Sequence, residues 1–283
     1  MSTAAIGARA AAAVGSAQLP DTAGVQTQAG VLRSEWTKLR SLRSTMWTLL
    51  VAVALTIGFG ALVSGVSASQ YDTDSPAERA IFSAVSTSLS GFTIAQLAFG
   101  VLGVLVITGE YSTGMIHSSL AAVPRRLPVL WGKMVVYATT TFIISLAASA
   151  VSFFVGQALL SSTGVAASIG DPGALRSVVG AALYVTVAGL IGLALGTIVR
   201  NTAAGISVFV SVFFVIPPLM GLLPKSFADS VTPYLPSNAG EALYSSVRTT
   251  NQQLAPWTGF AILCAYAVVL IAVAAWELKR RDA

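Results

Sequence analysis

Six long apolar stretches without any ionisable side chain constrain this chain more than any other feature of its sequence. They cover residues 45–66, 87–108, 134–160, 177–199, 201–223 and 257–276, and none of them holds an Asp, Glu, Lys, Arg or His. A helix that crosses a bilayer needs about 20 mostly apolar residues. The sequence therefore predicts an all-α membrane protein with six transmembrane helices.

The composition of the whole chain also restricts the class of protein. Only 10% of the 283 residues are charged and the mean hydropathy is +0.78, whereas a soluble domain is about 25% charged. This excludes most cytosolic enzymes and nucleic-acid-binding proteins. One Cys and one His are too few for a disulfide framework or a Cys/His metal cluster. The sequence also lacks a G-x-x-x-x-G-K-[ST] loop that would bind nucleotide phosphates, so we expect no cofactor on this chain.

The distribution of Lys and Arg predicts the orientation of the spans. If the six stretches cross the membrane in turn, 12 of the 16 basic residues lie on the side of the N-terminus. The four on the other side are Arg79, Arg176, Lys225 and Arg248. Because basic residues are retained on the cytoplasmic side, both termini are expected in the cytoplasm.

Two segments precede the first span. Residues 1–30 are rich in Ala, Gly, Ser, Thr and Gln and read as a disordered cytoplasmic extension or as the product of a misassigned start codon. Residues 31–44 combine apolar residues at roughly helical spacing with basic residues on other faces. This pattern predicts an amphipathic helix that lies in the cytoplasmic interface. The alternative is a positive flank that only sets topology.

The region around span five is rich in proline. Pro217 and Pro218 lie near the outer end of that span, and proline cannot continue the hydrogen-bond ladder of a helix. Span five is therefore expected to be short. Residues 224–256 follow on the outer side, and we expect re-entrant or interfacial helices there, buried in protein or lining a wet cavity.

The absence of charged residues inside the spans indicates what could drive transport by this chain. Ion-coupled transporters generally carry ionisable residues within their spans, and the six stretches contain none. We therefore expect transport by this chain to draw its energy from another subunit; the alternative is coupling to sodium at a site built from carbonyl groups. Phe92, Gln96 and Phe99 share one face of the second span, so they are candidates for lining a pathway or, equally, for a helix-packing stripe. The spans hold no paired polar groups of the kind that an intramembrane enzyme would need.

The segment that follows span two carries a specific resemblance. Its short motifs are Gly109-Glu110, Gly114-Met115-Ile116, Pro124-Arg125-Arg126 and Gly132-Lys133. In this order, residues 109–133 resemble the cytoplasmic loop of the permease subunits of bacterial ABC-2 type exporters, in which a helix couples to the ATPase. Six spans, an amphipathic helix before the first and a long outer loop before the last agree with that family, over residues 31–283. Met115 stands where the family often has Thr, and residues 1–30 lie outside the pattern.

The resemblance implies a non-catalytic permease domain over 31–283 in a bacterial cytoplasmic membrane. It would pair with a second permease copy, identical or related, contact membrane lipids, and bind two separate ATPase subunits that hold ATP and Mg²⁺. The residues implied in ATPase coupling are Glu110, Tyr111, Gly114, Met115, Ile116, Leu120, Pro124, Arg125 and Arg126. The interfacial helix would add a second contact through Glu35, Trp36, Lys38, Leu39 and Arg40, and the turn at Arg200-Asn201 a minor third.

Several alternatives stay open. Arg125 and Arg126 would pair with acidic residues of the ATPase or with lipid phosphates, or they would only set topology. The uncharged spans favour an amphipathic or hydrophobic cargo, such as a drug or antibiotic, a lipid or a small peptide. A non-transporting scaffold or sensor subunit of an assembly or immunity system is the alternative function.

Overall fold

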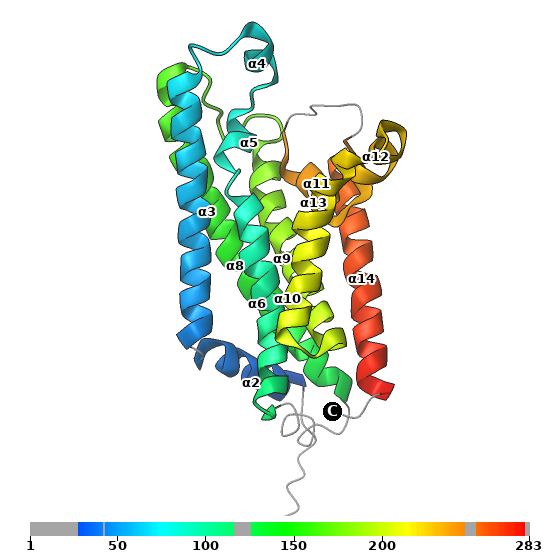
Figure 1. The fold of residues 1–283 in the computed structure, drawn as a ribbon. Coiled ribbons are helices and arrows are strands. Elements are labelled where there is room, and N and C mark those ends of the chain that lie inside the picture. Colours follow the sequence, from blue (N-terminus) through cyan, green and yellow to red (C-terminus); the bar gives the residue numbers. More distant parts are fainter. Residues whose placement is uncertain (1–27, 42, 116–125, 247–252, 281–283) are drawn as a thin grey trace, which may run out of the picture.

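The computed structural model of the chain describes residues 28–41, 43–115, 126–246 and 253–280. Within these ranges every element of regular secondary structure is a helix. Six helices are long and apolar enough to cross a membrane, which confirms the predicted all-α fold with six candidate spans. Figure 1 shows these helices side by side in a bundle, with the short helix α2 (Gln28–Ser41) across one end.

The six candidate spans follow the predicted order. Their bounds are α3 (Arg43–Gln70), α6 (Phe92–Ser112), α8 (Arg126–Leu160), α9 (Ala174–Val199), the segment Thr202–Leu222 that begins with α10 (Thr202–Val210), and α14 (Pro256–Arg280). Helix α2 and the C-terminal end of α14 lie at the same end of the bundle (Figure 1). The opposite end carries the short helices α4 (Pro76–Ile81), α5 (Ala84–Ser88), α12 (Lys225–Val231) and α13 (Pro236–Tyr244).

Helix α9 lies at the centre of the bundle. In its most apolar stretch 83% of the residues are buried within the chain, compared with 28% in α3. Glycines allow α6 and α9 to approach closely: a Cβ on Gly103 would lie 2.1 Å from the carbonyl oxygen of Gly189, and one on Gly192 would lie 2.2 Å from that of Gly100. Small residues serve this purpose where helices pack in lipid.

The second span is shifted along the sequence relative to the predicted 87–108. Residues 84–88 form the separate helix α5, and α6 begins at Phe92 and continues to Ser112. A tertiary contact explains the break between them, since a Cβ on Gly91 would lie 1.9 Å from the carbonyl oxygen of Thr56 in α3. The later end places Glu110 inside the helix, which matters for the site described below.

Span five is irregular but not short. Regular α-helix ends at Val210, a π-helical turn covers Ser211–Val215, and α11 (Ile216–Leu219) carries the two prolines. Because Pro217 has no N–H, the carbonyl four residues earlier loses its usual partner. The π turn shifts the pattern, with Ile216 N–H donating to the Ser211 carbonyl, and the helical path continues to Leu222. Helices α12 and α13 then follow before span six; their depth in a membrane stays a prediction.

Candidate functional site

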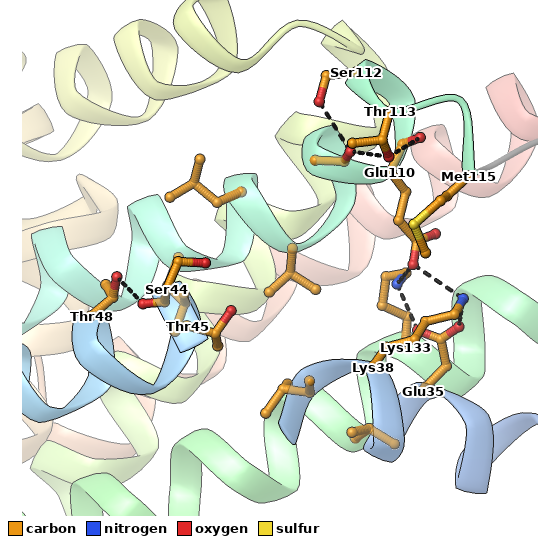
Figure 2. Close-up of a pocket in the computed structure, with 16 residues that line it drawn as sticks. Glu35, Lys38, Ser44, Thr45, Thr48, Glu110, Ser112, Thr113, Met115 and Lys133 are labelled. Atoms are coloured by element: carbon orange, nitrogen blue, oxygen red, sulfur yellow. Dashed lines mark hydrogen bonds and ion pairs between the residues drawn. The ribbon is translucent and has the colours of Figure 1, made fainter. Parts of the chain in front are cut away.

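Four charged side chains from three helices meet at the end of the bundle that carries α2 (Figure 2). The Lys133 ammonium of α8 donates to Oε2 of Glu35 in α2 at 2.6 Å and to Oε1 of Glu110 in α6 at 2.7 Å. Lys38, one turn after Glu35, donates to Oε1 of Glu35 at 2.7 Å and to Oε1 of Glu110 at 3.2 Å. We call these four residues the ionic cluster.

The ionic cluster is largely shielded from water. The side chains of Glu35 and Lys133 are each 4% exposed, that of Glu110 is 9% exposed and that of Lys38 is 25% exposed. Two carboxylates and two ammonium groups balance to no net charge. Removing charges from water is costly, so this arrangement depends on each charge keeping its partners.

The cluster shifts the pKa values of Glu35 and Lys38, its two residues on α2. Burial alone would raise the pKa of Glu35, but the charge and hydrogen bonds of Lys133 and Lys38 outweigh this and hold the pKa below its ordinary value. Burial alone would lower the pKa of Lys38, but the carboxylates of Glu35 and Glu110 raise it above its ordinary value. Both groups are therefore charged at neutral pH.

The local sequence explains how α2 reaches α8. Val31, Glu35 and Leu39 are spaced four residues apart, share one face of α2 and are buried. Opposite them, a Cβ on Gly132 would lie 2.8 Å from a methyl carbon of Val31, so the absence of a side chain there permits the close approach. The next residue, Lys133, then faces Glu35.

A cavity of about 380 Å³ lies beside the ionic cluster, between α2, α3, α6 and α8. Glu35, Lys38, Glu110 and Lys133 form one part of its lining, and most of the remaining wall is apolar. Hydroxyl-bearing residues from the start of α3 and the end of α6 complete it: Ser44, Thr45, Thr48, Ser112 and Thr113 (Figure 2).

The structure describes some of the predicted coupling residues and not others. Glu110 and Tyr111 belong to the last turn of α6, Gly114 follows with a φ of +71°, and Met115 is exposed. Arg126 begins α8. Ile116, Leu120, Pro124 and Arg125 lie outside the described residues.

A second contact ties the end of α6 to α9. The guanidinium of Arg200 lies 5.4 Å from the centre of the Tyr111 ring, a cation–π geometry. Arg200 ends α9 in a left-handed conformation with a φ of 56°. The turn at Arg200-Asn201, which is predicted to contact the ATPase, therefore lies close in space to Tyr111 of the predicted coupling segment.

The interfacial-helix residues divide between two faces of α2. Trp36 and Arg40 are exposed, whereas Glu35 and Leu39 are buried and Lys38 is half-buried. The sequence predicted the helix, but its buried face packs against α8 and contains an acidic residue. The position of its exposed face in a membrane stays a prediction.

The three pathway candidates lie in the interior of the subunit. Phe92, Gln96 and Phe99 are all buried. The Tyr184 hydroxyl of α9 donates to Oε1 of Gln96, and the ring of Phe92 lies 6.4 Å from that of Tyr244 in α13. They therefore pack against other helices of the subunit, and their role in a pathway stays a prediction.

Sequence reasoning did not find the ionic cluster as a unit. It assigned Glu35 to a surface contact and read Lys133 only as a topology signal and motif residue. Glu35 is the single acidic residue in the segment 31–44, and its four-residue spacing from Val31 and Leu39 was a signal of burial. Among the described residues, no group of three His, Cys, Asp or Glu side chains is placed to hold a metal ion.

Comparison with known proteins identifies a family. A family model described as ABC-2 family transporter protein matches residues 29–283. A search of curated proteins found no match.

Proposed function

Because the chain belongs to the ABC-2 transporter family and is a membrane permease with six apolar helices, we propose that it is the membrane subunit of an ATP-driven exporter. In this proposal, ATP and Mg²⁺ bind to two separate ATPase subunits. Two permease copies, identical or related, form the path for an amphipathic or hydrophobic cargo. The α2 end of the bundle faces the cytoplasm of a bacterium, and the exposed face of α2 lies among membrane lipids.

The observation that carries the proposal is the position of the ionic cluster. Residues 113–125 connect α6 to α8, and Glu110 and Lys133 bind one another near the two ends of this connection at 2.7 Å. Glu35 and Lys38 attach α2 to the same point. A partner that pulls on the connection would therefore displace the ends of α2, α6 and α8 together.

The chemistry of the spans supports an external energy source. The six predicted stretches contain no Asp, Glu, Lys, Arg or His, and coupling ions generally need such partners inside the membrane. The charges of the ionic cluster are at the end of the bundle and are paired with one another. They suit a mechanical connection between α2, α6 and α8. In the proposal, ATP-driven closure of the ATPases pushes on spans one, two and five, and the cluster couples span two to α2, which precedes span one.

The test is isolation of the tagged protein from native membranes in mild detergent, followed by mass spectrometry of its partners and an ATP hydrolysis assay. A stoichiometric ATPase subunit and vanadate-sensitive hydrolysis are the expected result. An inactive preparation without a nucleotide-binding partner, also after chemical cross-linking in the intact membrane, would contradict the exporter proposal and favour the scaffold or sensor alternative.

Charge reversal tests the coupling segment separately. Arg125→Glu combined with Arg126→Glu is expected to weaken ATPase binding and lower vanadate-sensitive hydrolysis. Lys225→Glu, on α12 at the other end of the bundle, is the matched control and should leave both unchanged. Equal losses in the two variants would contradict a role for this segment.

A further inference from the structure

The cavity beside the ionic cluster has the properties of a small-molecule site. We propose that it binds an uncharged amphiphile, an apolar chain that carries a hydroxyl or amide head. Its volume of about 380 Å³ falls in the range of ligand pockets, roughly 300–1,000 Å³. The inference concerns binding to this chain alone and does not rest on the proposed transport function.

The walls of the cavity suit an apolar chain. Aliphatic side chains from α2, α6 and α8 line it: Leu39, Leu102, Leu105, Val106 and Val136. Leu105 is 38% exposed, so the wall at this position continues to the outside of the bundle. An apolar chain that enters there leaves water or lipid and contacts aliphatic carbon, which is favourable in the first case and nearly neutral in the second.

Three hydroxyl oxygens at the polar edge of the cavity are available as hydrogen-bond acceptors. The Thr48 hydroxyl donates to the carbonyl of Ser44 at 2.9 Å, and the Thr113 hydroxyl donates to that of Gly109 at 2.8 Å. Ser112 likewise donates to Gly109. Because each hydroxyl has one proton but two lone pairs, these oxygens can still accept. A head group that donates a hydrogen bond can therefore be bound at these oxygens.

Glu110 supplies an independent indication of a missing donor. Its Oε1 binds both lysines, but its Oε2 is buried and has no hydrogen-bond partner among the described residues. Such an unsatisfied oxygen is costly. Glu110 lines the cavity together with Met115, and the Met115 side chain lies beside the Glu110 carboxylate in Figure 2.

The charge balance of the ionic cluster selects against ions. Two lysines and two glutamates already neutralise one another at distances of 2.6–3.2 Å. An ammonium or carboxylate head would bring a charge without a counter-charge into a poorly hydrated site, which is unfavourable. The preferred head is therefore a neutral donor.

The test uses the full chain in phosphatidylcholine nanodiscs and a decanol that carries a photoreactive diazirine. Labelling is expected on α3 near residues 45–48 and on α6 near residues 102–106. Decanol should compete at about fivefold lower concentration per lipid than decyl methyl ether, which cannot donate, as one hydrogen bond predicts. Charged decylamine and decanoate should compete no better than the ether. The proposal would be overturned if decanol competed no better than decyl methyl ether, or if decylamine or decanoate competed as well as decanol.

A variant locates the site. Leu105→Trp should fill the cavity and abolish the competed labelling. Leu159→Trp on α8 is the matched control, because Leu159 is 42% exposed and does not line the cavity. Unchanged labelling in a folded Leu105→Trp protein would overturn the assignment. If this variant does not fold, the competition order in the unaltered chain decides by itself.

Discussion

Replacing Lys133 by Met removes the cation that bridges Glu35 and Glu110 while keeping a long, unbranched side chain. The two carboxylates, 4% and 9% exposed, would then share Lys38 alone. Removing one partner of a buried ion pair costs about 3–5 kcal/mol, because the remaining charge is left without compensation. Lys38→Met is the matched control, since Lys38 is 25% exposed and water can replace part of its contribution, as in exposed pairs worth about 1 kcal/mol or less.

The assay is thermal unfolding of the purified protein in detergent, followed by tryptophan fluorescence at one fixed heating rate. In a protein of this size about 1 kcal/mol shifts Tm by about 2–4 °C. Lys133→Met should therefore lower the apparent Tm by about 6–20 °C, and Lys38→Met by less than about 4 °C. Adding Glu35→Gln to Lys133→Met should recover part of the loss, because the cluster is again neutral. Equal shifts for the two lysines, or no recovery, would refute the reasoning.

Three further predictions follow from other contacts. Gly192→Ala should lower the yield of folded protein on gel filtration, because its Cβ would lie 2.2 Å from a carbonyl oxygen of α6, whereas Gly58→Ala, with no atom within 4 Å, should not. Tyr184→Phe should destabilise the protein by about 1–3 kcal/mol, seen as a lower Tm, because the buried α6 amide that it contacts loses its donor; an unchanged Tm would contradict this. The lowered pKa of Glu35 contributes stability that is present above its unfolded pKa of about 4.3 and is lost as pH falls below it. The raised pKa of Lys38 contributes stability that is present below about 10.4 and is lost as pH rises further. The contribution of the cluster to Tm, measured as the difference in Tm between the unaltered chain and Glu35→Gln, should therefore be constant between these limits, and a difference that varies inside them would count against the cluster.

The spans could be predicted because their signal is local. A run of about 20 apolar residues is enough to indicate a membrane-crossing helix, whatever that helix packs against. The same holds for α2, whose apolar residues recur at roughly helical spacing and indicate an amphipathic helix before any partner is known. Helix content and order therefore followed from the sequence.

The site could not be predicted in the same way because its contacts are distant in the sequence. Glu35 and Lys133 are 98 residues apart, and an amphipathic pattern gives a buried face without naming its partner. The break before α6 has a similar origin, since it depends on the approach of Gly91 to the backbone of α3. The resemblance selected Glu110 and the Gly132-Lys133 pair as motif residues, but only the packing of α2 on α8 explains why they matter together.

The separation of Glu35 and Lys133 also has a consequence for the order of assembly. Translation proceeds at about 5–20 residues per second, so Lys133, which follows Glu35 by 98 positions, is made about 5–20 s later. During that interval α2 cannot dock on α8. Lys38 is synthesised three residues after Glu35 and pairs with it at 2.7 Å, which leaves the waiting helix with a compensated carboxylate. Docking of α2 is therefore a late step of biogenesis, one that reports that the third span is already in place.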